Sequence, residues 1–249
     1  MLGVIGGTGL TQLETLKSTR RQIVRTPYGD ASQPLIFGEL SGCDVVFLAR
    51  HGGGHTIPPH AVNYRANIWA LHSVGVKNLL AIATVGGISS DLSAGEIVLP
   101  HQIIDYTHGR ESTYHDGIEL PVMHIDFTEP YSSALRAVCL QAASNIHIDL
   151  HDGGIYACAQ GPRLETAAEI NRFERDGATI VGMTGMPEAA LARELGLRYA
   201  ALCPVANQAA GRGDSAHGIR YEVMMQKLEI TMQKIRAMIE EIAKTCPGS

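Results

Sequence analysis

The chain of 249 residues is 45% hydrophobic and 18% charged, with a formal net charge of -5, which is the composition of an ordinary folded domain. Its 20 basic residues are scattered among 25 acidic ones, so no basic surface for a nucleic acid is indicated. The N-terminus lacks a basic leader region, and the most apolar stretch, residues 79–88, is too short to span a bilayer. We therefore expect neither export nor membrane insertion.

The cysteines bear on the cellular compartment. They are an odd number without any C-x-x-C pair, namely Cys43, Cys139, Cys158, Cys203 and Cys246. This pattern predicts neither a disulfide framework nor a zinc knuckle, which fits a reducing cytoplasm.

Periodicity along the chain predicts strands mixed with helices. Short apolar runs bounded by glycine or polar residues predict buried strands at residues 2–5, 35–37, 45–48, 79–82 and 200–202. Apolar residues at helical spacing predict helices at residues 62–71, 131–143, 166–174, 188–195 and 219–243. We therefore predict a single α/β domain over residues 1–249, with helices around a central sheet.

A glycine-rich turn at residues 6–10 follows the first predicted strand. Its glycines let backbone N–H groups converge on an anion, and the Thr8 hydroxyl adds a donor. A dinucleotide-binding fingerprint would require glycine where Gln12 stands, so that interpretation fails. Taken alone, the motif fits an anion site and a plain tight turn equally well.

A second candidate anion site is the segment 50–59, which follows another predicted strand. Arg50 offers a planar fork that matches phosphate oxygens, and His51 beside it adds a hydrogen-bond donor. His51 and His55 have the spacing of zinc ligands on a helix, but the glycines between them and the prolines after them disfavour a helix. We predict no metal site here; a flexible surface loop is the alternative to anion binding.

These two motifs, together with further strings, resemble one enzyme family. The strings are HTIPP at residues 55–59, VNYRANIWAL at residues 62–71, GPR at residues 161–163, and Met183 followed by Thr184. Over nearly the whole chain they resemble the methylthioadenosine phosphorylase branch of the purine nucleoside phosphorylase family. The resemblance implies a mixed, partly barrel-like sheet surrounded by helices, a homotrimer, and phosphorolysis of a purine nucleoside. Inorganic phosphate is then the co-substrate, and no other cofactor is expected.

The resemblance also assigns roles to residues that are far apart in the chain. The positions that match the family's phosphate-binding residues are Thr8, Arg50, His51, Ala83, Thr84 and Thr184. Met183 matches the methionine that lies against the ribose, and His124 matches the residue that reaches into a neighbouring subunit's site.

At the base end the chain departs from the adenine-specific members of that branch. Those members carry a serine at the position of Glu165 and Asp-x-Asp at positions 207–209, whereas this chain has Glu165 and then Asn207, Gln208 and Ala209. The glutamate and asparagine are those of 6-oxopurine nucleoside phosphorylases. A Glu165 carboxylate accepts from N1–H of hypoxanthine but faces the N1 lone pair of adenine, and the Asn207 amide donates to N7 or O6. Such a mismatch rejects the wrong base by about 10⁴ to 10⁵-fold.

Each of the two residues also has a purely structural explanation. Glu165 fits an acid at a helix N-terminus near Thr166, and Asn207 fits a strand-end cap. For each residue taken singly, the structural explanation is preferable. Because both residues occur at the matching positions of the family, together they favour recognition of a 6-oxopurine.

The segment after Asn207 sets the 5' end of the nucleoside. Relatives specific for a 5'-hydroxyl bind it with a histidine, which methylthio-specific relatives replace by a small apolar residue. Ile219 fits this position and predicts an apolar pocket for a thioether methyl, with His217 as the alternative. We predict 5'-methylthioinosine as the substrate; inosine or guanosine is the alternative if His217 occupies the position, and methylthioadenosine if the base assignment fails.

The predicted mechanism is attack of phosphate on the anomeric carbon without a protein nucleophile, while Asn207 stabilises charge on the departing purine. Two other classes of function fit part of the pattern. A purine-binding sensor would use the same pocket but would not need the phosphate residues. A nucleoside hydrolase would carry an aspartate-rich calcium site near the N-terminus, which this sequence lacks.

Overall fold

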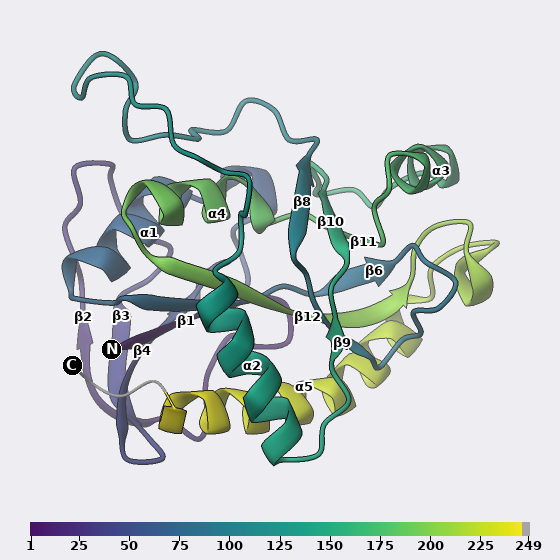
Figure 1. Ribbon diagram of the computed structural model, residues 1–249, viewed down its shortest axis with the longest axis horizontal. Helices are drawn as coiled ribbons and strands as arrows, with labels where there is room; N and C mark the ends of the chain where they lie inside the picture. The colour runs from purple at the N-terminus through teal and green to yellow at the C-terminus, as the bar shows by residue number, and fades with distance from the viewer. Residues whose placement is uncertain (246–249) are drawn as a thin grey trace.

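The computed structural model describes residues 1–245 and confirms the predicted α/β fold (Figure 1). Within this part of the chain one mixed sheet of 12 strands is formed. The strands are β1 (Leu2–Gly6), β2 (Lys17–Gln22), β3 (Leu35–Leu40), β4 (Cys43–Ala49), β5 (Asn78–Ile82), β6 (Val85–Gly87), β7 (Ile97–Leu99), β8 (Gln102–Asp105), β9 (His151–Asp152), β10 (Ile155–Cys158), β11 (Ile180–Gly182) and β12 (Arg198–Gln208). The helices are α1 (Tyr64–Ser73), α2 (Ser133–Asn145), α3 (Ala167–Arg175), α4 (Gly185–Glu194) and α5 (Tyr221–Thr245), with short 3-10 turns at Pro59–Ala61 and Gly213–Ser215. Cys246 lies outside the described residues.

Parallel strands form the centre of the sheet. β1 lies between β4 and β5, and β5 pairs on its other edge with β12, all in parallel. Strands covered on both faces are apolar along their whole length, and every residue of β1 is buried. The strands predicted from apolar runs lie within β1, β3, β4, β5 and β12, so this prediction is confirmed.

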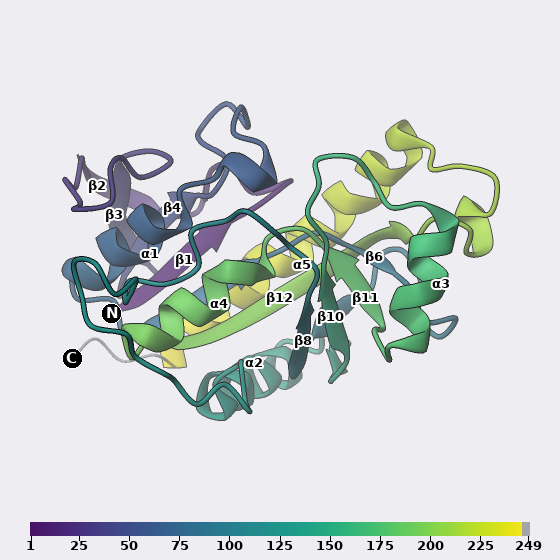
Figure 2. The ribbon, with the colours of Figure 1, turned by 90° about the horizontal axis from the view of Figure 1, so that it is seen from above.

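Helices cover both faces of the sheet (Figures 1 and 2). α1 and α4 pack together on one face, and α2 and α5 pack together on the other. One apolar core includes Ile68 of α1 and Leu191 of α4, and the other includes Leu135 of α2 and Ile235 of α5. All the predicted helices are present, each within a few residues of its predicted bounds.

β12 carries the chain from the centre of the sheet to one end of it. Its first half pairs with β5 and its second half with β6. The register with β6 shifts between Val205 and Asn207, which leaves Ala206 as a bulge. Because a bulge bends its strand and re-aims the side chains that follow, the backbone itself orients Asn207.

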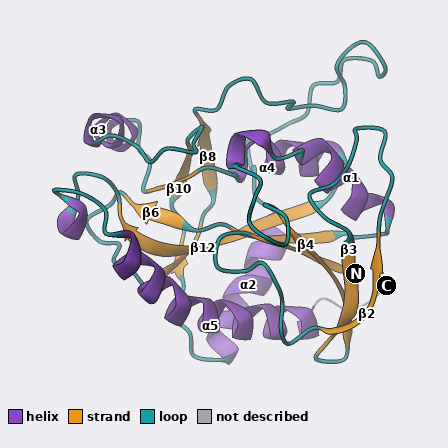
Figure 3. Ribbon diagram, turned by 180° about the vertical axis from the view of Figure 1, so that it is seen from behind, coloured by secondary structure: helices purple, strands orange, loops and turns teal. Residues whose placement is uncertain are grey.

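Seven of the twelve described strands, β2 and β6 to β11, were not predicted, and neither was a long loop. All residues of β2 are exposed and its sequence, KSTRRQ, is polar, as suits a strand at the edge of the sheet. Residues 106–132 form a long loop that joins β8 to α2 and extends away from the sheet (Figures 1 and 3). Within residues 1–245 no helix is long and apolar enough to cross a membrane.

Candidate active site

A cavity of about 580 Å³ lies where the central strands end. Its walls come from the segments that follow β1, β4, β5 and β11 and from the end of β12, and the carboxyl ends of parallel strands are where α/β proteins bind ligands. The predicted site residues that line it are Thr8, Arg50, His51, Ala83, Thr84, Glu165, Met183, Thr184, Asn207, Ala209 and Ile219. Segments separated by most of the chain therefore share one cavity.

Two predicted residues do not line this cavity. Gln208 lines a smaller neighbouring cavity, and its Oε1 accepts a hydrogen bond from the Asp214 N–H at 3.0 Å. His124 is exposed on the long loop 106–132, and its predicted role concerns the site of another subunit.

The glycine-rich turn after β1 brings the backbone against Arg50. The Leu10 N–H donates to the Gly7 carbonyl at 3.0 Å, and the Thr84 hydroxyl donates to the Thr8 carbonyl at 2.9 Å. A Cβ at Gly7 would lie 2.6 Å from the Ile82 carbonyl oxygen and 2.9 Å from Nη1 of Arg50, so a larger residue would disturb the contact between them.

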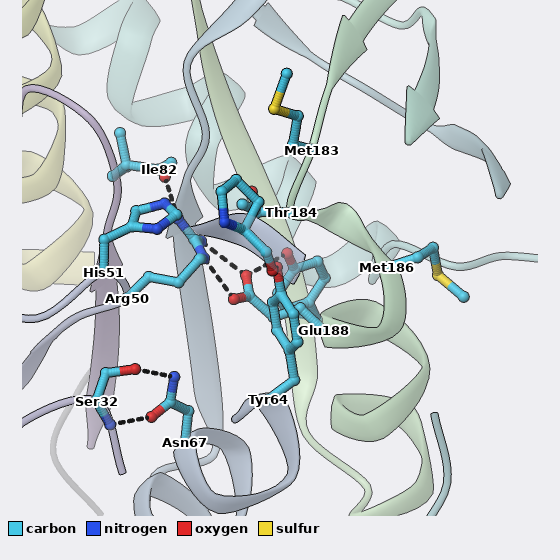
Figure 4. A network of polar contacts seen from close by, with 12 residues as sticks. Ser32, Arg50, His51, Tyr64, Asn67, Ile82, Met183, Thr184, Met186 and Glu188 are labelled. Atoms are coloured by element: carbon cyan, nitrogen blue, oxygen red, sulfur yellow. Dashed lines mark hydrogen bonds and ion pairs between the residues drawn. The ribbon is translucent and has the colours of Figure 1, made fainter. Parts of the chain in front are cut away.

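Arg50 is buried and paired with Glu188 of α4. Its Nε and Nη2 donate to the two carboxylate oxygens of Glu188 at 2.6 and 2.8 Å, and its Nη1 donates to the Ile82 carbonyl at 3.0 Å. The Tyr199 hydroxyl donates to the same carboxylate at 2.9 Å. Figure 4 shows the guanidinium between Ile82 and Glu188, with His51 and Thr184 close by. A guanidinium carries five N–H groups, so Nη1 and Nη2 each retain one N–H for a ligand.

His51 is neutral near pH 7. Its Nδ1 lies 2.8 Å from the Ile57 carbonyl oxygen, and since a carbonyl only accepts, Nδ1 carries the proton. Burial, and then the neighbouring Arg50 charge, lower the pKa of His51 to about 4. Nε2 is therefore a lone-pair acceptor, suited to a protonated phosphate oxygen, whereas the sequence had suggested a donor.

His55 does not form a helical pair with His51. The two rings lie 4.6 Å apart in a series of turns. Among residues 1–245 there is no group of three or more His, Cys, Asp or Glu side chains that could hold a metal ion.

Glu165 also lines the cavity, just before α3. The N-terminus of α3 is already satisfied, because Thr166 and Glu169 form a capping box and Glu169 also pairs with Arg163 at 2.7 Å. Glu165 is therefore not needed as a helix-terminal acid. Burial raises the pKa of its carboxyl group, as expected for an acid held away from water.

Asn207 has one local hydrogen bond and keeps capacity for a ligand. Its Nδ2 donates to the Gln208 carbonyl at 2.6 Å, which is the strand-end contact considered above. A carboxamide has two N–H groups and an acceptor oxygen, so one N–H and Oδ1 remain available on the cavity side of the bulge.

The remaining wall of the cavity is apolar where the sequence predicted a thioether pocket. Ile219 and Met224 both line it, whereas His217 is exposed and is not among its lining residues. Among the described residues the wall beside Ile219 therefore offers no imidazole to a 5'-hydroxyl.

Arg110, from the long loop, joins two segments beside the cavity, although it is not among the lining residues. Its Nη1 donates to the carbonyl oxygens of Met183 and Met186 at 2.9 and 2.5 Å, and its Nη2 donates to that of Gln160 at 2.8 Å. The loop before Glu165 is close to Met183, since a Cβ at Gly161 would lie 2.5 Å from its sulfur. No sequence motif indicated Arg110, and Glu188 was recognised only as part of a predicted helix.

The sequence of the chain matches a known protein family. The model of the phosphorylase superfamily matches residues 1–244.

The chain belongs to the phosphorylase superfamily.

Within this superfamily the chain is similar to enzymes acting on related nucleosides. It is 50% identical over 240 residues to the probable S-methyl-5'-thioinosine phosphorylase of Pseudomonas syringae pv. tomato, with 96% of each chain covered. It is 42% identical over 250 residues to the 6-oxopurine nucleoside phosphorylase of Pyrococcus furiosus, covering 98% of this chain and 93% of the relative. The structure of the methylthioadenosine phosphorylase of Schistosoma mansoni in complex with adenine matches with a TM-score of 0.93 at 31% identity, covering 98% of this chain and 91% of that one. The predicted family is confirmed, and this superfamily member is a nucleoside phosphorylase, a pentosyltransferase.

Proposed function

We propose that this phosphorylase converts S-methyl-5'-thioinosine and phosphate into hypoxanthine and 5-methylthioribose 1-phosphate, as a cytoplasmic enzyme of purine salvage. One observation carries the proposal: Glu165 and Asn207, the pair suited to a 6-oxopurine, line the same cavity as Arg50 and His51. The proposed reaction uses inorganic phosphate as co-substrate and needs no other cofactor.

Hydrogenphosphate binds at the end of the cavity formed by Arg50. The two remaining N–H groups of Arg50 and the hydroxyls of Thr8 and Thr184 donate to its oxygens, with the Ala83-Thr84 backbone alongside. Its P–OH group donates to Nε2 of His51. This arrangement leaves an unprotonated oxygen to act as the nucleophile.

In the reaction, an unprotonated phosphate oxygen bonds to the anomeric carbon as the bond from that carbon to purine N9 breaks. The electron pair of the broken bond leaves with the purine, and the ribose passes through an oxocarbenium-like state. The free N–H of Asn207 donates to N7, and Glu165 accepts from N1–H. Donors aimed at such developing charge contribute about 3 to 4 kcal/mol each. The proton of hydrogenphosphate passes to the purine, so the products are neutral hypoxanthine and a sugar phosphate dianion.

The 5' end of the cavity distinguishes the proposed substrate from inosine. Ile219 and Met224 supply an apolar surface that suits an S-methyl group. Phosphorolysis of inosine or guanosine is the second candidate, because the same base-binding pair serves it. The exposed position of His217 disfavours this candidate.

We also propose that the enzyme is a homotrimer in which His124 of one subunit approaches a neighbour's cavity. His124 stands on the long loop beside Val122 and near Ile118, whose side chains are 65% and 89% exposed. Apolar side chains gathered on a surface favour burial against another chain. Sedimentation equilibrium should give three times the chain mass of 26.7 kDa, and a His124→Ala variant should have a raised KM for the nucleoside.

The proposal is tested by initial rates of base release from methylthioinosine, methylthioadenosine and inosine, each with and without phosphate. The expected result is phosphate-dependent release that is fastest from methylthioinosine. Dominance of methylthioadenosine would contradict the assignment of Glu165 and Asn207, and dominance of inosine would contradict that of Ile219. Binding without phosphate-dependent release would instead indicate a purine sensor.

A further inference from the structure

The charge balance at the phosphate end of the cavity is unusual for an anion site. Arg50 is the one Lys or Arg side chain among the described residues that line the cavity. Its guanidinium already has a counter-ion, because Glu188 holds it through two hydrogen bonds and both side chains are only 1% exposed. With His51 neutral, the residues around the phosphate position carry no formal net charge.

The pair is too far from solvent to be a surface ion pair. Burial alone would lower the pKa of Arg50, but the Glu188 carboxylate raises it above its ordinary value, so the guanidinium stays charged. Tyr199 adds a third hydrogen bond to the carboxylate. Buried ion pairs of this kind contribute little net stability compared with apolar packing, so stability alone does not account for the presence of Glu188.

We propose that Glu188 is a positioning residue that cancels the charge of Arg50, so that the negative charge of bound phosphate remains available to the ribosyl cation in the transition state. This inference rests on the proposed phosphorolysis. An unpaired Arg50 would bind phosphate strongly in the ground state, and its positive charge would offset the phosphate charge that the sugar needs. Binding that is equally strong before and during the reaction does not accelerate it.

Glu188 also occupies some of the N–H groups of the guanidinium and so limits those that remain for the ligand. Its carboxylate occupies the Nε side, and the Ile82 carbonyl occupies one N–H of Nη1. One N–H group then remains on each terminal nitrogen, and guanidinium N–H groups bind phosphate oxygens well. Arg50 therefore positions phosphate by hydrogen bonds, while the Glu188 carboxylate balances its charge.

The test is a Glu188→Gln variant, which keeps the size of the side chain and removes its charge. Phosphate then becomes the counter-ion that Arg50 lacks. We expect a lower Tm without phosphate, and a phosphate-induced rise in Tm at least about twice that of the wild type, because tighter binding stabilises the folded state more. The KM for phosphate should fall, and kcat on methylthioinosine should fall by about tenfold or more. A purely structural role would instead lower Tm and raise the KM for phosphate.

Two further variants complete the design. Glu188→Asp keeps the charge but shortens the reach, so its phosphate-induced rise in Tm and its KM for phosphate should stay close to those of the wild type. Glu39→Gln removes an exposed carboxylate that lies 4.0 Å from Lys17 and should leave all of these quantities unchanged. If the Gln variant does not fold, the Asp variant decides, because a role in geometry alone predicts weakened phosphate binding in it.

Failure of this inference is distinguishable from failure of the proposed function. If the wild type is active and Glu188→Gln binds phosphate more weakly than it does, the charge argument is overturned and the proposed phosphorolysis stands. A wild type without phosphate-dependent base release would overturn the proposed function. The changes in Tm with phosphate alone would then still report on the charge of Arg50.

Discussion

A Glu165→Gln substitution should move the preference of the enzyme between 6-oxopurine and 6-aminopurine nucleosides. The carboxyl is half-buried, and its nearest charged neighbours, Arg163 and Glu169, pair with each other, so a bound base is its natural partner. Hydrogen bonds to a charged group contribute about 1.5 to 3 kcal/mol, against about 0.5 to 1.5 for neutral ones. Loss of the charge should therefore lower kcat/KM for methylthioinosine by about 1 to 1.5 kcal/mol, which is roughly fivefold to tenfold.

The same substitution should help methylthioadenosine. Its N1 lone pair faces a carboxylate in the wild type but would receive an N–H group from glutamine. The ratio of the two kcat/KM values should then shift toward methylthioadenosine by about 10²-fold in total. Initial rates on both nucleosides at saturating phosphate measure this ratio, with Glu39→Gln as the control. If both activities fell in equal proportion, Glu165 would have a structural role and the base-recognition argument would be refuted.

Four other perturbations have defined outcomes. Because burial raises the pKa of Glu165, its carboxylate should be protonated at a higher pH than an ordinary carboxylate. The ratio of methylthioadenosine to methylthioinosine activity should therefore rise as pH falls, and a pH-independent ratio would contradict this. Asn207→Ala should lower kcat by about 10² to 10³-fold with little change in Tm, and an unchanged rate would remove Asn207 from the mechanism. Ile219→His should raise activity on inosine relative to methylthioinosine, while His217→Ala should leave the ratio as it is. Arg110→Met should raise the KM for the nucleoside more than that for phosphate, because Arg110 joins the loop before Glu165, through Gln160, to Met183; equal rises would indicate a general loss of structure.

The predictable part of the fold is the part that burial imprints on the sequence. β1 and β5 are covered on both faces, so they read as apolar runs, and α5 buries one side, so its apolar residues recur every three or four positions. β2 carries no such pattern because it is an exposed edge strand. The full length of β12 was missed since it changes partners from β5 to β6, and pairing across the sheet leaves no local signal.

The candidate site divides in the same way. Thr8 and Arg50 were predicted from a glycine-rich turn, from a guanidinium that matches phosphate oxygens and from the family resemblance, and both line the cavity. The orientation of Asn207 was not predictable, since it depends on a bulge that only the pairing with β6 reveals. Nor was the acceptor role of His51, because the proton position follows from the contact with the Ile57 carbonyl.

The role of Glu188 could not be predicted from its own segment of the sequence. An acid near the start of a helix is ordinarily explained by the helix dipole and exposure to water, and nothing near Glu188 in the sequence argues otherwise. Its partner lies 138 positions away, and burial of both groups makes each depend on the other. The charge that a bound phosphate meets is therefore a property of the folded pair, and it cannot be inferred from the anion-binding motif that contains Arg50.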